Sequence, residues 1–222
     1  MKTKNNHVVM ILSSVVCLLP IILSLVVYNE LPEKIAIHWD VTGSPDNYAS
    51  KAFAALGLPL LFMIINIYVN FHLHNAPKRA NASTAVIAIT SWFCPFLSLI
   101  LTPIILFVAM GAAIPISLMA SVLMGISLIL FGNYLPKNRQ NYVIGIKLPW
   151  TLDNADNWNK THRMASRLWI FGGIVFLIGS FLFPGSLVWS ILSLAIIALL
   201  IIAPRLYSYS LYKRHGERED ND

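Results

Sequence analysis

The chain has 222 residues, of which 57% are hydrophobic and only 12% are charged, and its mean hydropathy is +0.67. This composition excludes an ordinary soluble domain, in which about 25% of the residues are charged. The net charge of +6 could indicate nucleic-acid binding, but the lysines and arginines are spread through the linkers between apolar runs. We therefore expect a membrane protein that makes no direct contact with nucleic acid.

Six uncharged apolar runs set the expected number of membrane spans, because a helix needs roughly 20 residues to cross a hydrocarbon core of about 30 Å. The expected spans are residues 8–28, 52–71, 84–110, 116–135, 168–183 and 187–203. Pro20 should kink the first of them. The sequence therefore predicts an all-α, multi-pass protein of the cell membrane with six transmembrane helices.

The linkers divide the chain into three expected parts. These are a two-span unit at 1–83 with a loop at 29–51, a two-span hairpin at 84–135, and a C-terminal part at 136–222 with a polar loop at 136–167, a second hairpin and a tail. The end of the tail, residues 213–222, should be mobile and solvated. Cys17 and Cys94 fall within spans, so we interpret them as packed thiols.

The distribution of lysine and arginine predicts the orientation of the spans, because cytoplasmic loops carry the excess of these residues. With the N-terminus inside, only Lys34 and Lys51 of the 16 lysines and arginines face outward. Both termini and the loop at 136–167 should then be cytoplasmic, and the loop at 29–51 should be extracellular. This outer loop is mildly acidic, with four carboxylates against its two lysines.

Alternating side chains over residues 35–40 predict a strand in the outer loop, and Thr42–Asp46 supplies the residues of a turn. Trp39 and Tyr48 carry rings suited to the membrane surface, so the loop should lie against the lipid headgroups. The outer residues with a candidate role in recognition are Pro32, His38, Trp39, Asp40, Gly43 and Asp46.

His38 and Asp40 lie two residues apart and therefore share one face of the expected strand. A cation or a basic group of a partner could bind between them, but no third ligand follows at a metal-binding spacing. We expect no metal site and no cofactor.

The longest polar run, residues 141–167, should contain a helix that leads into the fifth span. Pro149 lacks a backbone donor and biases Leu148 away from helix, so the new helix should begin after it, capped by Thr151 or Asp153. Residues that recur at helical spacing along one face are Trp158, Thr161, His162, Ala165, Leu168 and Trp169. We expect Trp150 to fold back against this helix and to form one cytoplasmic surface or pocket with Trp158 and His162.

His162 is a conceivable general base, but no serine, cysteine or carboxylate stands at a recognisable spacing from it, so we expect no enzyme. Lys160, Arg163 and Arg167 should lie at the membrane surface, where they would attract anionic lipid or a protein partner. Charged residues are absent from the spans, which disfavours an ion pump. Two alternatives stay open: a small transporter or peptide-efflux component, and a membrane enzyme that uses His162.

Two sets of motifs carry a resemblance to a known family. The polar loop contains, in order, Asn141, Ile144–Lys147, Pro149–Thr151, Trp158 and Lys160–Arg163. This order resembles the C-terminal motif of the SdpI family, the immunity proteins for the sporulation-delaying-protein toxin, with Lys147 where arginine is expected. The outer loop contains Leu31–Pro32, Ile35, Ile37–Trp39, Gly43, Asp46 and Ser50–Lys51. This second set is similar to the small domain of unknown function that often precedes the SdpI motif.

The resemblance implies a function and a set of residues. The chain would protect a cell, expected to be a Gram-positive bacterium, from a secreted antibacterial peptide toxin. It would also signal, by holding a transcriptional repressor at the membrane when it meets the toxin. The cytoplasmic residues implied in recognition are Asn141, Gly145, Lys147, Pro149, Trp150, Thr151, Trp158, Lys160, His162 and Arg163.

Overall fold

The computed structural model describes residues 2–40, 42–76 and 81–219. Lys78 and Arg79, which contribute to the expected orientation, lie outside these ranges. Within them, six helices are long and apolar enough to cross a membrane: His7–Glu30, Phe53–Asn75, Thr84–Ala109, Ile116–Lys137, Ala155–Leu182 and Leu187–Arg214. The predicted six-span fold is therefore confirmed, whereas the orientation of the termini stays a prediction.

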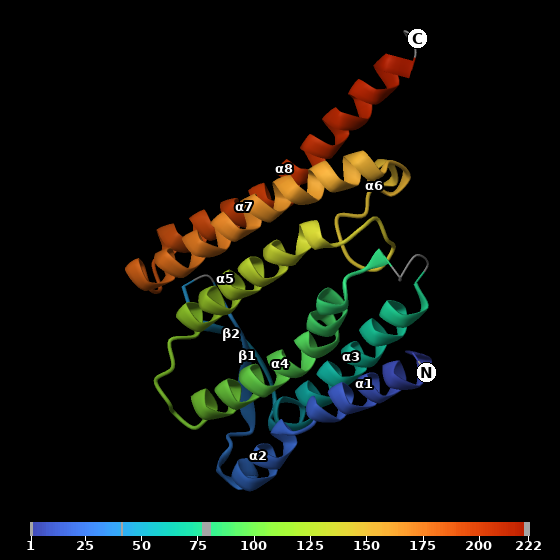
Figure 1. Cartoon of the computed structure of the whole chain (residues 1–222). Coiled ribbons are helices and arrows are strands. Elements are labelled where there is room, and N and C mark those ends of the chain that lie inside the picture. Colours follow the sequence, from blue (N-terminus) through green and yellow to red (C-terminus); the bar gives the residue numbers. More distant parts are fainter. Residues whose placement is uncertain (1, 41, 77–80, 220–222) are drawn as a thin grey trace. The chain divides into compact units, whose positions relative to one another are not determined.

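Two compact units make up the chain (Figure 1). The first contains the residues up to Asn75 and Ile87–Ile116, and the second contains Ala76–Val86 and the residues from Ser117 onward. The three-part division expected from the linkers stays a prediction.

The first unit begins with a broken helix. Helix α1 (Lys2–Val16) ends before Pro20, and α2 (Pro20–Val27) begins at that residue, as the expected kink requires. Because the turns around Pro20 are tight, the Ile21 N–H bonds to Leu18 O and leaves the carbonyl of Cys17 without its helical partner. The Ser98 hydroxyl of α4 (Thr84–Ala109) donates to this carbonyl at 2.7 Å, which ties α4 to the break.

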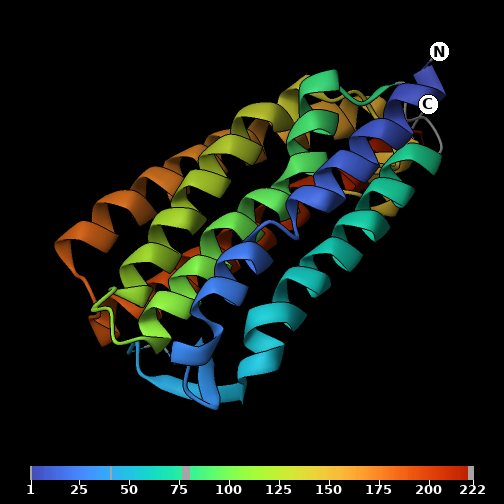
Figure 2. The ribbon, with the colours of Figure 1, turned by 90° about the horizontal axis from the view of Figure 1, so that it is seen from below.

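Helix α3 follows the short η2 turn (Phe53–Gly57), covers Leu58–Asn75 and packs beside α1, as Figure 2 shows in teal and blue. Its buried Asn66 joins three helices. With its carboxamide oxygen facing the serine hydroxyls, Asn66 accepts from Ser13 Oγ (2.8 Å) and Ser14 Oγ (3.0 Å) and donates to Ser91 O (3.0 Å). Pro95 leaves the Ser91 carbonyl without a helical donor, so Asn66 supplies the missing bond.

A β-hairpin connects the η1 turn (Tyr28–Glu30) to η2 in the first unit. Strand β1 (Lys34–Trp39) confirms the predicted strand and pairs antiparallel with β2 (Pro45–Ser50). The second strand was not predicted, because Pro45 and the short polar residues after it are typical of turns; as the first residue of its strand, Pro45 is tolerated. Ile35 is buried against Leu31, Ala54, Ala55 and Leu106, which anchors the hairpin to the helices.

The second unit contains three long helices and a short one. They are α5 (Ile116–Tyr134), continued by the η4 turn (Leu135–Lys137), then α6 (Pro149–Asp153), α7 (Ala155–Leu182) and α8 (Leu187–Glu219). A Cβ added at Gly173 of α7 would lie 2.7 Å from Gly125 O of α5, so glycine permits the close packing of these helices.

Helices α7 and α8 lie side by side (Figure 1). The Trp169 indole donates to Leu200 O at 3.0 Å, a carbonyl that Pro204 leaves without a helical partner. The backbone of α8 stays helical through Glu219, and the expected mobility and solvation of residues 213–222 stay a prediction. Aromatic packing of Tyr209 and Tyr212 on Trp150 supports this extension.

The expected orientation can be tested by thiol labelling at two exposed positions, Ser44 in the turn between the strands and Asn159 near the start of α7. Ser44→Cys should react with a membrane-impermeant maleimide in intact cells, and Asn159→Cys should react only after the membrane is opened. The parent chain is the control, because Cys17 and Cys94 are both buried. Labelling of Asn159→Cys but not Ser44→Cys in intact cells would reverse the orientation.

Candidate functional site

The loop between η4 and α6 is closed by Asn141, which is fully buried. Its side-chain oxygen accepts the N–H groups of Val143 (2.8 Å) and Ile144 (2.9 Å), and its amide donates to Arg139 O (2.7 Å). A single carboxamide thereby satisfies three backbone groups that have no regular secondary structure. Asn141 therefore acts by shaping the loop.

His162 on α7 holds the next part of this loop. The Ile146 N–H donates to Nε2 at 3.0 Å, and the other ring nitrogen, Nδ1, lies 2.8 Å from the Trp158 carbonyl. Because Nε2 accepts, the ring proton must be on Nδ1, where it donates to the carbonyl. Both nitrogens of this fully buried ring are thus used in structural bonds. This arrangement disfavours a role for His162 as a general base.

Trp158 lies next to His162 on α7 and, like it, packs beneath the loop. Its indole N–H donates to Asn138 O at 2.9 Å, and its ring stacks on His162 with centroids 4.0 Å apart. Gly145 passes directly over both rings with a φ of 140°, and a Cβ there would lie 2.5 Å from His162 Nε2. Only glycine fits this position, because the backbone conformation and the contact both exclude a side chain.

Thr151 links the loop to α6, which begins at Pro149. Its hydroxyl accepts the Leu148 N–H at 2.9 Å and donates to Ile146 O at 2.8 Å. The expected cap of the long helix was therefore wrong: neither Thr151 nor Asp153 caps α7. Asn154 does so, by accepting the Asn157 N–H at 2.9 Å.

Trp150 contacts α8. Its indole donates to Ser208 Oγ at 2.6 Å, and its ring lies 5.4 Å from that of Tyr209 and 5.8 Å from that of Tyr212. Asn157 adds a second tie by donating to Ser208 O at 2.9 Å. Sequence reasoning missed this group, because its members are separated by about 50 residues and no spacing rule connects them. The available signal was the mixed aromatic and serine stretch at residues 207–212 of α8.

The expected surface of Trp150, Trp158 and His162 does not form. Trp158 and His162 are fully buried beneath the loop, whereas Trp150 is directed to α8. The error arose because helical spacing predicts which residues share a face but not what covers that face. These three side chains hold the loop, α7 and α8 together.

The cationic residues of the motif lie at its edge. Lys147 donates to Tyr142 O (3.3 Å) and Val143 O (3.4 Å). A lysine ammonium therefore binds two carbonyls of the loop at the position where arginine was expected. Lys160 pairs with Asp156 at 2.6 Å. The side chains of Lys160 and Arg163 are exposed, which makes them available to a partner.

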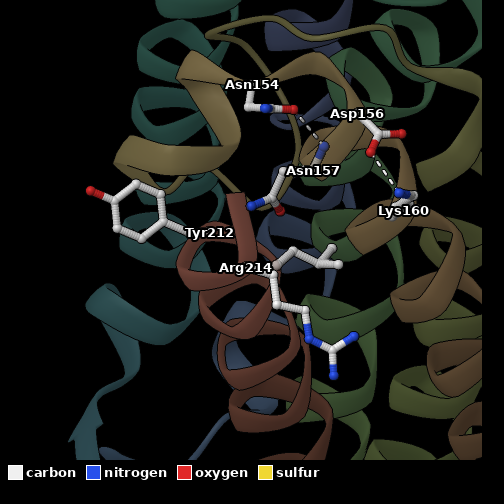
Figure 3. Close-up of a pocket in the computed structure, with 7 residues that line it drawn as sticks. Asn154, Asp156, Asn157, Lys160, Tyr212 and Arg214 are labelled. Carbon is white, nitrogen blue, oxygen red and sulfur yellow. Dashed lines mark hydrogen bonds and ion pairs between the residues drawn. The ribbon is translucent and has the colours of Figure 1, made fainter. Parts of the chain in front are cut away.

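A pocket of about 160 Å³ opens beside the cap of α7, and Figure 3 shows the residues around it. Asn154, Asp156, Asn157 and Lys160 contribute from the start of α7, and Leu211, Tyr212 and Arg214 contribute from α8. Asn157, at the bottom of this region, already bonds to Thr161 and Ser208. The pocket therefore lies against the polar contact that joins the two helices.

The outer residues lie on the hairpin, with Pro32 before it and Gly43 in its turn at a φ of 86°. His38 pairs with Asp46 across the strands and not with Asp40. Asp40 instead closes the turn. Hydrogen bonds from the Thr42 hydroxyl (2.6 Å) and the Ser44 N–H (2.9 Å) hold the pKa of its carboxyl below the usual range.

Comparison with known proteins supports both resemblances. Residues 137–208 match the SdpI/YfhL protein family, and residues 15–63 match a domain of unknown function, DUF1648. The chain is 29% identical over 209 residues to "Immunity protein SdpI" of Bacillus subtilis (strain 168), an alignment that covers 94% of this chain and 98% of the relative. No solved structure matches the chain. The resemblance seen in the motifs is therefore confirmed.

The close packing of Gly145 on the rings of Trp158 and His162 can be tested with Gly145→Ala. Strain at this φ and the collision with His162 should together lower the free energy of unfolding by about 3 kcal/mol, measured by denaturation in detergent, and should expose the loop to protease. Gly185→Ala is the matched control, since its φ is also positive, at 69°, but a Cβ there meets nothing within 4 Å. It should cost about 1 kcal/mol through backbone strain alone. Equal effects of the two changes would contradict the close contact.

Proposed function

We propose that the chain is an immunity protein of the cell membrane, which protects its cell from a secreted antibacterial peptide. Its residues 137–208 match the SdpI/YfhL protein family. The alignment with the immunity protein SdpI carries this proposal, since it extends over nearly the whole of both chains. The ranges matched by the two family models, 15–63 and 137–208, contain the hairpin and the closed loop.

The role that we propose is recognition and not catalysis. His162, the residue that an enzyme of this fold would have used, is buried and has both ring nitrogens in backbone bonds. The surrounding Trp158, Thr151 and Asn141 also bond to the loop backbone. The buried part of the motif thus supports a rigid platform whose exposed edge meets a partner.

We propose that the β-hairpin is where the secreted peptide is first met. Ile35 fixes the hairpin to the helices, while Tyr48 on the other strand is 53% exposed and Trp39 is half-buried beside the turn. The His38–Asp46 and Lys51–Glu33 pairs brace the two strands. A braced hairpin with accessible aromatic rings can bind a peptide without a large ordering cost.

Survival of a toxin-sensitive bacterium that expresses the chain tests this function. Cells with the parent chain should survive purified sporulation-delaying toxin better than cells with an empty vector. Trp39→Ala should lower protection by roughly tenfold at an unchanged amount of membrane protein, because an aromatic anchor is lost. Trp92→Ala, which removes a partly exposed tryptophan from α4, should leave protection intact.

Two results would contradict the proposal. Survival equal to that of the empty vector would remove the immunity function for that toxin. Full protection by a chain with His38, Trp39 and Asp40 all replaced by alanine would remove the hairpin from the mechanism while leaving immunity in place.

We also propose that the chain signals by holding a transcriptional repressor at the membrane, with the end of α8 as the docking element. A 33-residue helix is about 50 Å long and exceeds the hydrocarbon core of about 30 Å, so its last turns project beyond the bilayer. Trp150 ties the loop to these turns through Ser208, Tyr209 and Tyr212. A change in the loop can thereby reach the docking element.

Substitution of Trp150 tests whether its contact with α8 is needed for signalling. Trp150→Ala should reduce membrane retention of a fluorescently labelled repressor by about fivefold on exposure to toxin, since both the ring contacts and the hydrogen bond to Ser208 are lost. Trp150→Phe keeps an aromatic ring and should retain more repressor than Trp150→Ala. If both variants retained as much repressor as the parent chain, the contact between Trp150 and α8 would have no part in signalling.

A further inference from the structure

Three cations lie on one face of α7 at its cytoplasmic-motif end. Lys160, Arg163 and Arg167 are separated by three and four residues, so their side chains project in the same direction along the helix. All three are exposed. Lys160 is compensated by Asp156 at 2.6 Å, whereas the partner of Arg163 among the described residues is a neutral carbonyl, Asn159 O, to which its Nε donates at 3.3 Å. The two guanidinium groups therefore carry most of the uncompensated charge.

A surface groove of about 590 Å³ runs beneath these cations. Met164, Leu168 and Phe171 form its apolar lining, which we call the floor, and Tyr207 of α8 also lines it. Aspartate and glutamate are missing from the lining among the described residues. The groove thus combines a cationic rim with an apolar floor.

The apolar floor continues along α7 away from the cations. Phe171, Ile174, Ile178 and Phe181 recur at spacings of three and four residues and are all exposed, the first by 67% and the last by 66%. They extend for about 15 Å along the helix axis, roughly half of a hydrocarbon core. Such a stripe on a membrane-spanning helix faces lipid, and it begins where the groove ends.

We propose that this groove binds one anionic phospholipid, with its phosphate held by Arg163 and Arg167 and an acyl chain lying along Phe171 and the stripe below it. Guanidinium groups bind phosphate oxygens through paired hydrogen bonds, and their position at the head of a lipid-facing stripe matches the order of charge and hydrocarbon in a phospholipid. A soluble phosphate would use the rim alone. The continuous apolar path favours the lipid.

Native mass spectrometry of the full chain, released from detergent after incubation with defined lipids, tests this assignment. Dioleoyl phosphatidylglycerol should be retained one-to-one, and dioleoyl phosphatidylcholine should bind at least about fivefold more weakly. The double variant Arg163→Gln/Arg167→Gln should lose about tenfold in affinity for phosphatidylglycerol, whereas Arg163→Lys/Arg167→Lys should keep most of it. Phe171→Ala should also weaken retention, because the acyl chain loses its first contact.

The matched control is Lys137→Gln/Arg139→Gln, which removes the same charge from exposed positions outside the groove. It should bind phosphatidylglycerol as the parent does. Equal loss in both double variants would reduce the effect to net charge and overturn the site. Displacement of the lipid by millimolar glycerol phosphate, or unchanged binding in Phe171→Ala, would identify a phosphate site and overturn the lipid.

Discussion

The need to satisfy every backbone polar group in an apolar interior determines how each unit is built. Lipid offers neither donors nor acceptors, so a carbonyl that loses its helical partner must find another within the protein. Prolines in α4 and α8 remove such partners, and the break at Pro20 removes another. The carbonyls concerned are those of Ser91, Leu200 and Cys17, and the side chains that meet them are Asn66, Trp169 and Ser98.

Each of these bonds joins two helices of one unit and fixes their relative position along the helix axes. Packing of apolar side chains against lipid-like neighbours gives little preference for one register over another, whereas a single buried hydrogen bond requires one. Asn66 of α3 shows this most clearly. It bonds to two serines of α1 and to the Ser91 carbonyl of α4, which Pro95 leaves without a helical donor. Helix breaks and the polar residues opposite them therefore act as a pair.

The same requirement explains the motif loop. Its irregular backbone is buried against α7, so its N–H and carbonyl groups depend on side chains: His162 and Trp158 from below, and Asn141 and Thr151 from within. The residues of this loop that carry the resemblance to the SdpI family are thus mainly those that close it. Arg163 and Arg167, by contrast, are exposed at the edge of the motif.

Sequence alone determined the spans, because the length and polarity of a segment decide whether it can cross a bilayer. It also determined the first strand of the hairpin and which residues share one face of α7, since these follow from periods of two and 3.6 residues. Helix ends were less well predicted. Asn154 caps α7 in place of Thr151 or Asp153, and α8 continues beyond residue 203, where the sixth span was expected to end.

Only the tertiary structure decided what covers the stripe and where Trp150 is directed. The loop places Ile146 on His162, and Ser208 receives the Trp150 indole from a helix more than 50 residues away. Periodicity describes one element at a time, so it cannot identify the partner on another element or say whether a shared face is exposed. The loop therefore covers Trp158 and His162, which were predicted to form a surface with Trp150. The reason is that buried polar groups pair with whatever donor or acceptor the fold brings near.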